Sequence, residues 1–210
     1  MALGAGVASA AAILLAVVLG AARPAPDLRA VLGETPCAAP CWHAITPGVT
    51  SLVDALRELR SDPDIEDLAI TVGSASWWWS ARLQDGRSAD SWPFDGRMLF
   101  QNDTADSQVD GLALLTSFRL GDLRNALGPP GQHILHTFST PERTGILYEA
   151  DYGELRVFSA LSCPLRPVDF WNAPVGVAFG TVELASGGET SSIEAEPAWP
   201  VERLTALCSP

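Results

Sequence analysis

The first twenty-two residues contain no charged side chain, and Arg23-Pro24-Ala25-Pro26 ends this apolar run abruptly. A membrane-spanning helix needs about 20 apolar residues, whereas the apolar part of a signal peptide needs roughly 7–15. Residues 1–22 fit an uncleaved anchor or a signal peptide, and Gly20-Ala21-Ala22 supplies the small residues that signal peptidase prefers. We predict that the rest of the chain lies outside the cytoplasm, anchored in the cell membrane by residues 1–22, with cleavage and secretion as the alternative.

The composition indicates a folded and acidic body. Hydrophobic residues make up 47% of the chain and charged residues 18%, which are values of globular rather than disordered proteins. The net charge of −12 would be repelled by the phosphates of nucleic acids, so we predict no nucleic-acid partner.

Four cysteines stand beyond the apolar run, at Cys37, Cys41, Cys163 and Cys208. In an extracytoplasmic protein we expect them to form disulfides, and four cysteines allow three pairings between which the sequence does not choose. Local closure favours Cys37 with Cys41, which leaves Cys163 and Cys208 to fasten the C-terminal tail to the body. A metal site is the competing interpretation, but His43 beside one cysteine pair matches the spacing of zinc ligands poorly.

Residues 23–44, which hold Cys37 and Cys41, form a proline-rich tether, and a helix signal follows it. Thr50 or Ser51 can cap this helix, and Ser61-Asp62-Pro63 stops it. Its apolar residues recur at helical spacing, at Leu52, Ala55, Leu56 and Leu59. Apolar stretches between turn residues then predict an antiparallel meander over residues 68–72, 76–83 and 97–100.

The same order of elements returns further along the chain. Residues 120–127 predict a second short helix, and strands are expected at 134–138, 145–150, 155–159 and 175–184. We therefore predict an α+β fold, in which an N-terminal apolar helix precedes an extracytoplasmic domain over residues 45–210. This domain would consist of tandem helix-plus-antiparallel-sheet units over residues 45–112 and 113–184, followed by a C-terminal tail, residues 185–210.

Two segments carry a resemblance to a known family. Gly48-Val49-Thr50 precedes the first expected helix, and Leu120-Gly121-Asp122-Leu123 leads to Leu127-Gly128-Pro129-Pro130 at the second. These segments resemble the Gly-x-Thr and Leu-Gly-x-Pro pattern of small envelope lipoproteins of the BamE/SmpA type, whose fold is shared with the β-lactamase inhibitor protein. The resemblance implies tandem helical hairpins on an antiparallel sheet, and a non-enzymatic protein that presents a surface to another protein. The lipid-anchoring cysteine of that family is absent here, so the identity of the partner does not carry over.

The search for catalytic motifs finds no nucleophile elbow, no His-Glu-x-x-His zinc helix and no glycine-rich phosphate loop. His133 and His136 are three apart on an expected strand, so they would face opposite sides and could not easily share a metal. We therefore predict no enzymatic activity, no cofactor and no metal. The alternative from another class is an envelope hydrolase that uses carboxylates such as Asp106, Asp110 or Glu149.

Trp77-Trp78-Trp79 is the one unusual aromatic run. Alternation along a strand sends Trp77 and Trp79 to one face and Trp78 to the other. Burial tendencies favour a role of these rings in the core, but one face could also join Trp92 and Phe94 in an aromatic patch for a peptide or glycan. The candidate binding residues are therefore Trp77, Trp78, Trp79 and Trp92. The predicted function is a binding or structural module of the cell envelope whose partner is an envelope protein or peptide.

Overall fold

The structure is a computed structural model that describes residues 41–79, 95–139, 144–182, 192–195 and 208. The described helices are α3 (Leu52–Ser61), α4 (Leu120–Leu127) and α5 (Pro167–Asn172). The strands are β1 (Ile65–Thr71), β2 (Ser74–Trp79), β3 (Gly96–Phe100), β4 (Val109–Arg119), β5 (Gln132–Ser139), β6 (Thr144–Asp151), β7 (Leu155–Ser162), β8 (Pro174–Gly180) and β9 (Ser192–Ala195).

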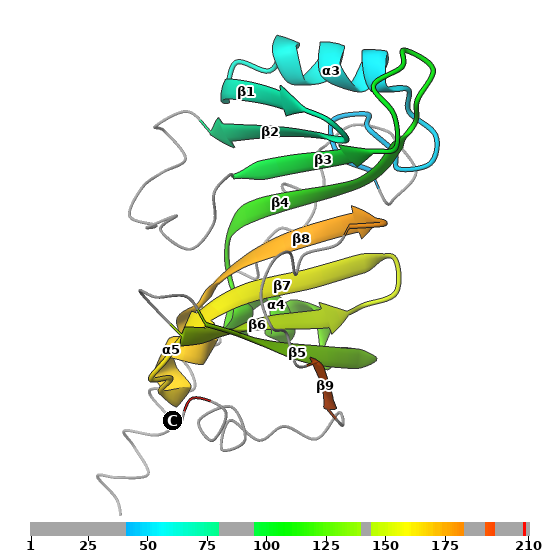
Figure 1. Cartoon of the computed structure of the whole chain (residues 1–210). Coiled ribbons are helices and arrows are strands. Elements are labelled where there is room, and N and C mark those ends of the chain that lie inside the picture. The colour runs from blue at the N-terminus through cyan, green and yellow to red at the C-terminus, as the bar shows by residue number, and fades with distance from the viewer. Residues whose placement is uncertain (1–40, 80–94, 140–143, 183–191, 196–207, 209–210) are drawn as a thin grey trace, which may run out of the picture.

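All nine strands belong to one antiparallel sheet with the order β1-β2-β3-β4-β8-β7-β6-β5-β9 (Figure 1). The fold is therefore mainly β, and the predicted α+β class of tandem helix-plus-sheet units was wrong. Residues 1–22, where an apolar helix was predicted, lie outside the described residues. Among the helices that are described, none is long and apolar enough to cross a membrane.

The pairing of β4 with β8 explains this correction. These two strands lie side by side in the middle of the sheet, where Leu112 faces Phe179 and Leu114 faces Val177. The sequence prediction missed β4, because Asp110-Gly111 resembles a turn and the apolar run after it lacks the alternation of a half-exposed strand. With β4 in place, the strands before and after α4 form one continuous sheet rather than separate units.

The order of a helix followed by four strands nevertheless occurs twice along the chain. The first set is α3-β1-β2-β3-β4, and the second is α4-β5-β6-β7-β8 with α5 inserted before β8. Whether residues 45–112 and 113–184 are repeats in the evolutionary sense stays a prediction.

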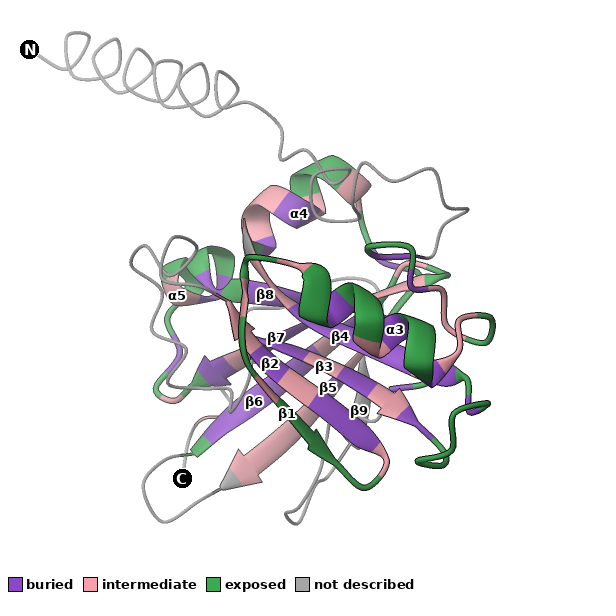
Figure 2. Ribbon diagram, turned by 90° about the horizontal axis from the view of Figure 1, so that it is seen from above, coloured by how far each residue is buried: buried purple, intermediate pink, exposed green. Residues whose placement is uncertain are grey.

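The two faces of the sheet carry cores of different size. The helix face, on which α3, α4 and α5 pack, carries the larger core, to which Leu59, Leu123 and Phe170 of these helices contribute. The opposite face, here called the second face, carries a smaller cluster. Its buried members are Ala113, Leu147, Phe158, Ala178 and Val182. In Figure 2 the buried residues concentrate in the strands, whereas the outer side of α3 and most of β1 are exposed.

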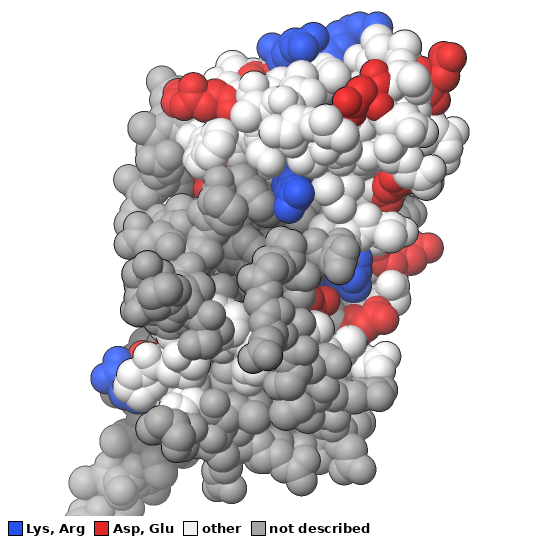
Figure 3. Space-filling model, viewed as in Figure 1, with Lys and Arg blue, Asp and Glu red and all other residues white. Residues whose placement is uncertain are grey.

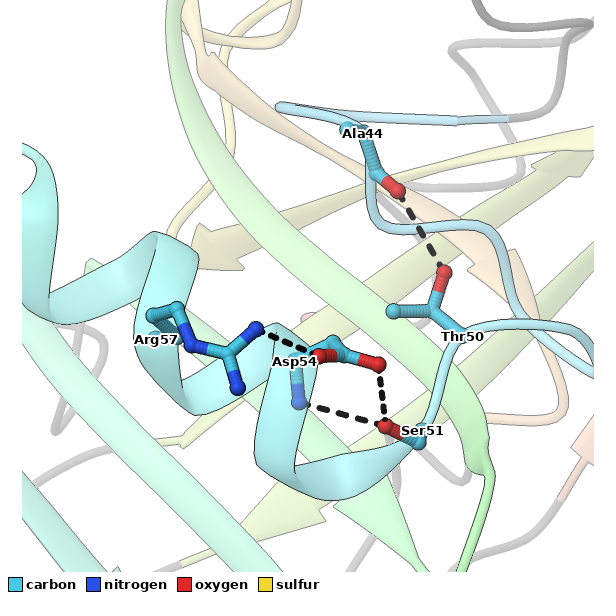
Figure 4. A network of polar contacts seen from close by, with 5 residues as sticks. All are labelled: Ala44, Thr50, Ser51, Asp54 and Arg57. Atoms are coloured by element: carbon cyan, nitrogen blue, oxygen red, sulfur yellow. Dashed lines mark hydrogen bonds and ion pairs between the residues drawn. The ribbon is translucent and has the colours of Figure 1, made fainter.

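The N-terminus of α3 is fixed by a side-chain cap (Figure 4). Ser51 accepts a hydrogen bond from the Asp54 backbone N–H at 3.2 Å, and its hydroxyl donates to the Asp54 carboxylate at 2.7 Å. The hydrogen bonds from Ser51 and then from Arg57 hold the pKa of Asp54 below its ordinary value. Of the two caps that the sequence predicted, Ser51 is therefore confirmed, while the Thr50 hydroxyl donates to the Ala44 carbonyl.

A disulfide joins Cys163, just after β7, to Cys208 in the C-terminal tail, with 5.3 Å between the Cα atoms. The predicted pairing of these two cysteines is thereby confirmed. In the chain-entropy model, closing a loop with a sequence separation of 45 stabilises the fold by about 4 kcal/mol. Cys41 is also disulfide-bonded, and Cys37 lies outside the described residues.

Aromatic rings lie over glycines of the neighbouring strand at three places in the sheet. The cross-strand pairs are Trp77 with Gly96, Phe138 with Gly145 and Phe158 with Gly176. A Cβ atom added at Gly96 would come within 2.1 to 2.4 Å of ring atoms of Trp77. The missing side chain therefore provides the space that the ring occupies.

Replacing Gly96 with alanine is expected to destabilise the protein, because the new methyl group would occupy the position of the Trp77 ring. Overpacking of a core costs roughly 1–3 kcal/mol, which guanidinium denaturation of the variant and the wild type would measure. Gly131→Ala is the matched control, since its Cβ would meet nothing closer than the Asp151 carbonyl at 3.8 Å. An equal loss of stability in both variants would contradict the role of the contact between ring and glycine.

Candidate functional site

Three tryptophan rings pack together on the helix face. Trp42 and Trp77 stack with their ring centroids 5.6 Å apart, and Trp79 meets these two rings edge-on at 5.6 and 6.3 Å. Trp42 and Trp77 are buried, and Trp79 is half-buried against the core. Aromatic pairs contribute about 0.5–1.5 kcal/mol each beyond the burial of their area. Of the candidate binding residues, Trp77 and Trp79 therefore contribute to packing, and Trp42, which sequence reasoning missed, holds the segment before α3 against them.

Trp78 is the candidate binding residue that points to the second face. It is half-buried and lies directly opposite Glu66 of β1. Ser76 pairs with Arg97 of β3, which makes Arg97 a diagonal neighbour of Trp78. Opposite side chains have Cβ atoms roughly 4.5–5.5 Å apart and diagonal ones about 7–8 Å, within reach of long side chains. Trp78, Glu66 and Arg97 together are called the Trp78 patch below, and Trp92, the fourth candidate, lies outside the described residues.

A buried carboxylate, Asp95, fixes the strand that carries this patch. The Trp79 backbone N–H donates a hydrogen bond to Asp95 Oδ2 at 2.9 Å, and the Asp95 N–H donates to the Trp77 carbonyl at 3.0 Å. The Asp95 carbonyl in turn accepts a hydrogen bond from the Leu115 N–H at 2.7 Å. Asp95 therefore holds the end of β2 on both sides of Trp78 and connects it to β4, so that the indole has a defined position.

A second polar group lies in the other half of the sheet, also on the second face. His136 Nε2 is 3.3 Å from Glu149 Oε1, and Arg156 Nη1 is 4.0 Å from Glu149 Oε2. Arg156 also donates hydrogen bonds to the carbonyls of Gly180 and Val182, at 3.1 and 2.8 Å. Sequence reasoning missed this trio, although aligning the three expected strands over residues 134–159 would have placed its members on neighbouring strands. The carboxylate can bind a cation or orient the imidazole of His136.

His133 lies on the helix face, opposite to His136, as alternation along the strand predicts. Its ring centroid is 6.1 Å from that of Tyr148. Burial, and then the charge of Arg124, lowers the pKa of His133, and burial raises the pKa values of Tyr148 and Tyr152. At neutral pH the imidazole is therefore uncharged and both phenols keep their protons. Over the described ranges, no group of three His, Cys, Asp or Glu side chains could hold a metal ion.

The three carboxylates of the hydrolase alternative are not brought together. Asp106 is exposed in the loop before β4, Asp110 is half-buried on β4, and Glu149 belongs to β6. Two strands, β8 and β7, separate β4 from β6, so a spacing of about 4.8 Å per strand puts Asp110 and Glu149 at least about 14 Å apart. Carboxylate pairs that hydrolyse glycosides lie at most about 9.5 Å apart.

Comparisons with known proteins found no family model, no curated protein and no solved structure that matches this chain.

The stability of the protein is expected to fall as the pH is lowered through the histidine range, because burial lowers the pKa of His133. A histidine whose pKa is lower in the folded state binds its proton more readily after unfolding. Its contribution is therefore complete above the unfolded pKa of about 6.5 and is lost below it. Chemical denaturation at several pH values between about 5 and 8 would measure this dependence.

His133→Phe should weaken the pH dependence of the free energy of unfolding. His43→Asn, at an exposed histidine in a left-handed turn that asparagine tolerates, is the comparison variant. It removes the contact of His43 Nδ1 with Asp62 Oδ2 at 3.3 Å but should keep the part of the pH dependence that comes from His133. A pH profile that His133→Phe leaves unchanged would contradict the assignment to His133.

Proposed function

We propose that the protein is a non-enzymatic binding or structural module of the cell envelope that works outside the cytoplasmic membrane. The apolar run at residues 1–22 supports an anchored or secreted protein. The bonded cysteines Cys41, Cys163 and Cys208 support an oxidising compartment. The resemblance to BamE/SmpA-type lipoproteins, on Gly48-Val49-Thr50 and the segment after Leu120, supports the same class of role.

The Trp78 patch is the observation that carries this proposal. Trp and Arg are the residues most enriched at the energetic centres of protein interfaces, and Trp78 has Arg97 and Glu66 as its neighbours. An indole offers a large apolar surface together with an N–H donor, so this uncharged side chain can bind a peptide. Trp77 cannot act in this way, because its ring is buried in the larger core.

An envelope hydrolase remains the alternative from another class, and the His136–Glu149 pair is the arrangement that it would use. The two functions are separated by assaying turnover across a panel of peptide, ester and glycan substrates. Turnover that is lost in Glu149→Gln would replace the binding-module proposal, whereas a binding module turns over none of them.

Trp78→Ala is expected to abolish binding of the partner while it leaves the fold intact. The chain has no lysine, so amine-reactive cross-linkers find no side chain, and a photo-reactive phenylalanine analogue at the exposed Ala69 is the better probe. Ala69 pairs with Ser76 on β2, which places the probe beside Trp78. We expect a discrete cross-linked product in native membranes, identified by mass spectrometry, that disappears in Trp78→Ala.

The same probe at the exposed Glu154, in the turn between β6 and β7, is the positional control and should give no such product. Trp77→Ala is the stability control, since removing a buried tryptophan costs about 3–5 kcal/mol. Trp78→Ala should cost clearly less. Cross-linking that is equal from both positions, or that survives Trp78→Ala, would contradict the proposal.

A further inference from the structure

β1 is an edge of the sheet, and among the strands that the structure describes it has a neighbour on one side only, β2. An edge strand presents unpaired backbone N–H and C=O groups that can pair with another extended chain. The Val72-Gly73 turn closes the hairpin, with Thr71 opposite Ser74. Because hydrogen-bonded residues alternate along an antiparallel pair, the N–H and C=O of Ile70 point away from β2.

The two parts of β1 differ in how they are protected against such pairing. Between Glu66 and Ala69 the register shifts at a bulge, where Asp67 has a φ of +50°. Bulges and charged residues are the usual devices that blunt an edge. From Ala69 to Thr71, however, the pairing with β2 is regular. The regular end of the strand is therefore the part on which a further strand can add.

Exposed apolar side chains are frequent in the part of the chain that leads to and includes β1. Of the six large hydrophobic side chains that are exposed among the described residues, four fall between residues 49 and 72. Ile70 is 46% exposed and Val72 is 90% exposed. Ile70 lies opposite Ala75, a residue of the larger core, so its side chain is on the helix face. A strand added here would place every second side chain beside Ile70, where an apolar residue fits.

The charge around β1 selects the kind of partner. The segment Asp62-Pro63-Asp64-Ile65-Glu66-Asp67 carries four carboxylates and no basic residue. Figure 3 shows acidic side chains, together with basic ones, over the end of the molecule at which Figure 1 places α3 and β1. A second copy would bring a second set of these carboxylates to the same edge, which like-charge repulsion disfavours. Basic side chains on the second face would instead meet Glu66 and come within reach of Trp78.

We propose that β1 accepts an extended segment of another protein as an added strand, in which apolar residues on the helix face alternate with arginine or lysine on the second face. Backbone hydrogen bonds would supply affinity, and the side chains opposite Ile70 and Glu66 would supply specificity. This inference names the partner class for the binding function proposed above and rests on it.

The test measures binding of fluorescent peptides to the full-length protein in detergent by fluorescence anisotropy. The first probe is a peptide of about eight residues, the length of a strand, in which valine and arginine alternate. We expect it to bind, and we expect an otherwise identical peptide with N-methyl groups on alternate residues not to bind, because its backbone cannot donate to the edge. A peptide that alternates valine and glutamate should also fail to bind.

Two protein variants address the edge itself. Ile70→Pro removes the outward N–H and leaves the hydrogen bonds between β1 and β2, so it should weaken binding about tenfold or more. Glu66→Gln should weaken binding severalfold, while Glu154→Gln, which removes the same charge from the other half of the sheet, should leave it unchanged. If Ile70→Pro fails to fold, the comparison between methylated and unmethylated peptides decides the question with the wild-type protein alone.

Equal binding of the N-methylated peptide would overturn the proposal, because it would reduce the interaction to charge attraction. Self-association in sedimentation experiments that Ile70→Pro abolishes would also overturn it, in favour of a second copy as the occupant. Cross-links from Ala69 that depend on Trp78 but survive Ile70→Pro would reject the added strand and keep the binding function. The absence of any discrete cross-linked product from Ala69 in the protein that keeps both Trp78 and Ile70 would reject the binding function itself.

Discussion

The contact between β4 and β8 is the one on which the rest of the structure depends. Every other strand pairing in the described sheet joins two strands from the same half of the chain, β1 to β4 or β5 to β9. This pairing alone joins the strand before α4 to the strand after α5. Its end is built from two glycines that face each other, Gly111 and Gly180. A Cβ at Gly111 would lie 2.5 Å from the Thr181 carbonyl oxygen, and one at Gly180 would lie 2.3 Å from that of Asp110. Only residues without side chains allow the backbones to approach this closely, and Gly180 also adopts a φ of +67° that other residues disfavour.

The pairing of β4 with β8 determines which parts of the two faces are buried. On the helix face, side chains of β4 and β8 such as Leu112 and Val177 belong to the larger core that α3, α4 and α5 cover. On the second face, Phe158 lies over Gly176 of β8 and fills the space beside Ala113 and Ala178. The middle of the sheet is thus packed on both sides. Side chains that could contact a partner therefore lie toward the two ends of the sheet, as Trp78 and the His136–Glu149 pair do.

The sequence predicted local structure well and long-range pairing poorly. α4 has the bounds that its apolar spacing predicted, and the cap of α3, Ser51, is one of the two residues that the sequence offered for it. Strand alternation also predicted that Trp78 would face away from Trp77. The cross-strand neighbours of Trp78 could not be predicted from the sequence, because a bulge at Asp67 shifts the register of β1 by one residue and places Glu66 opposite Trp78. A register of this kind depends on contacts across the sheet, and periodicity in one segment carries no information about it.

The bulged part and the regular part of β1 together affect which extended chains can pair with this edge of the sheet. A bare edge strand would pair with any extended chain, which is why proteins commonly blunt such edges. Here the bulge and the carboxylates occupy the first part of the strand, and the regular end near Ile70 keeps its outward backbone groups. The same carboxylates then attract one class of segment and repel others, including further copies of this acidic chain. Specificity is a difference between affinities, so under the proposed strand addition the charges that disfavour self-pairing would also determine which partner the edge accepts.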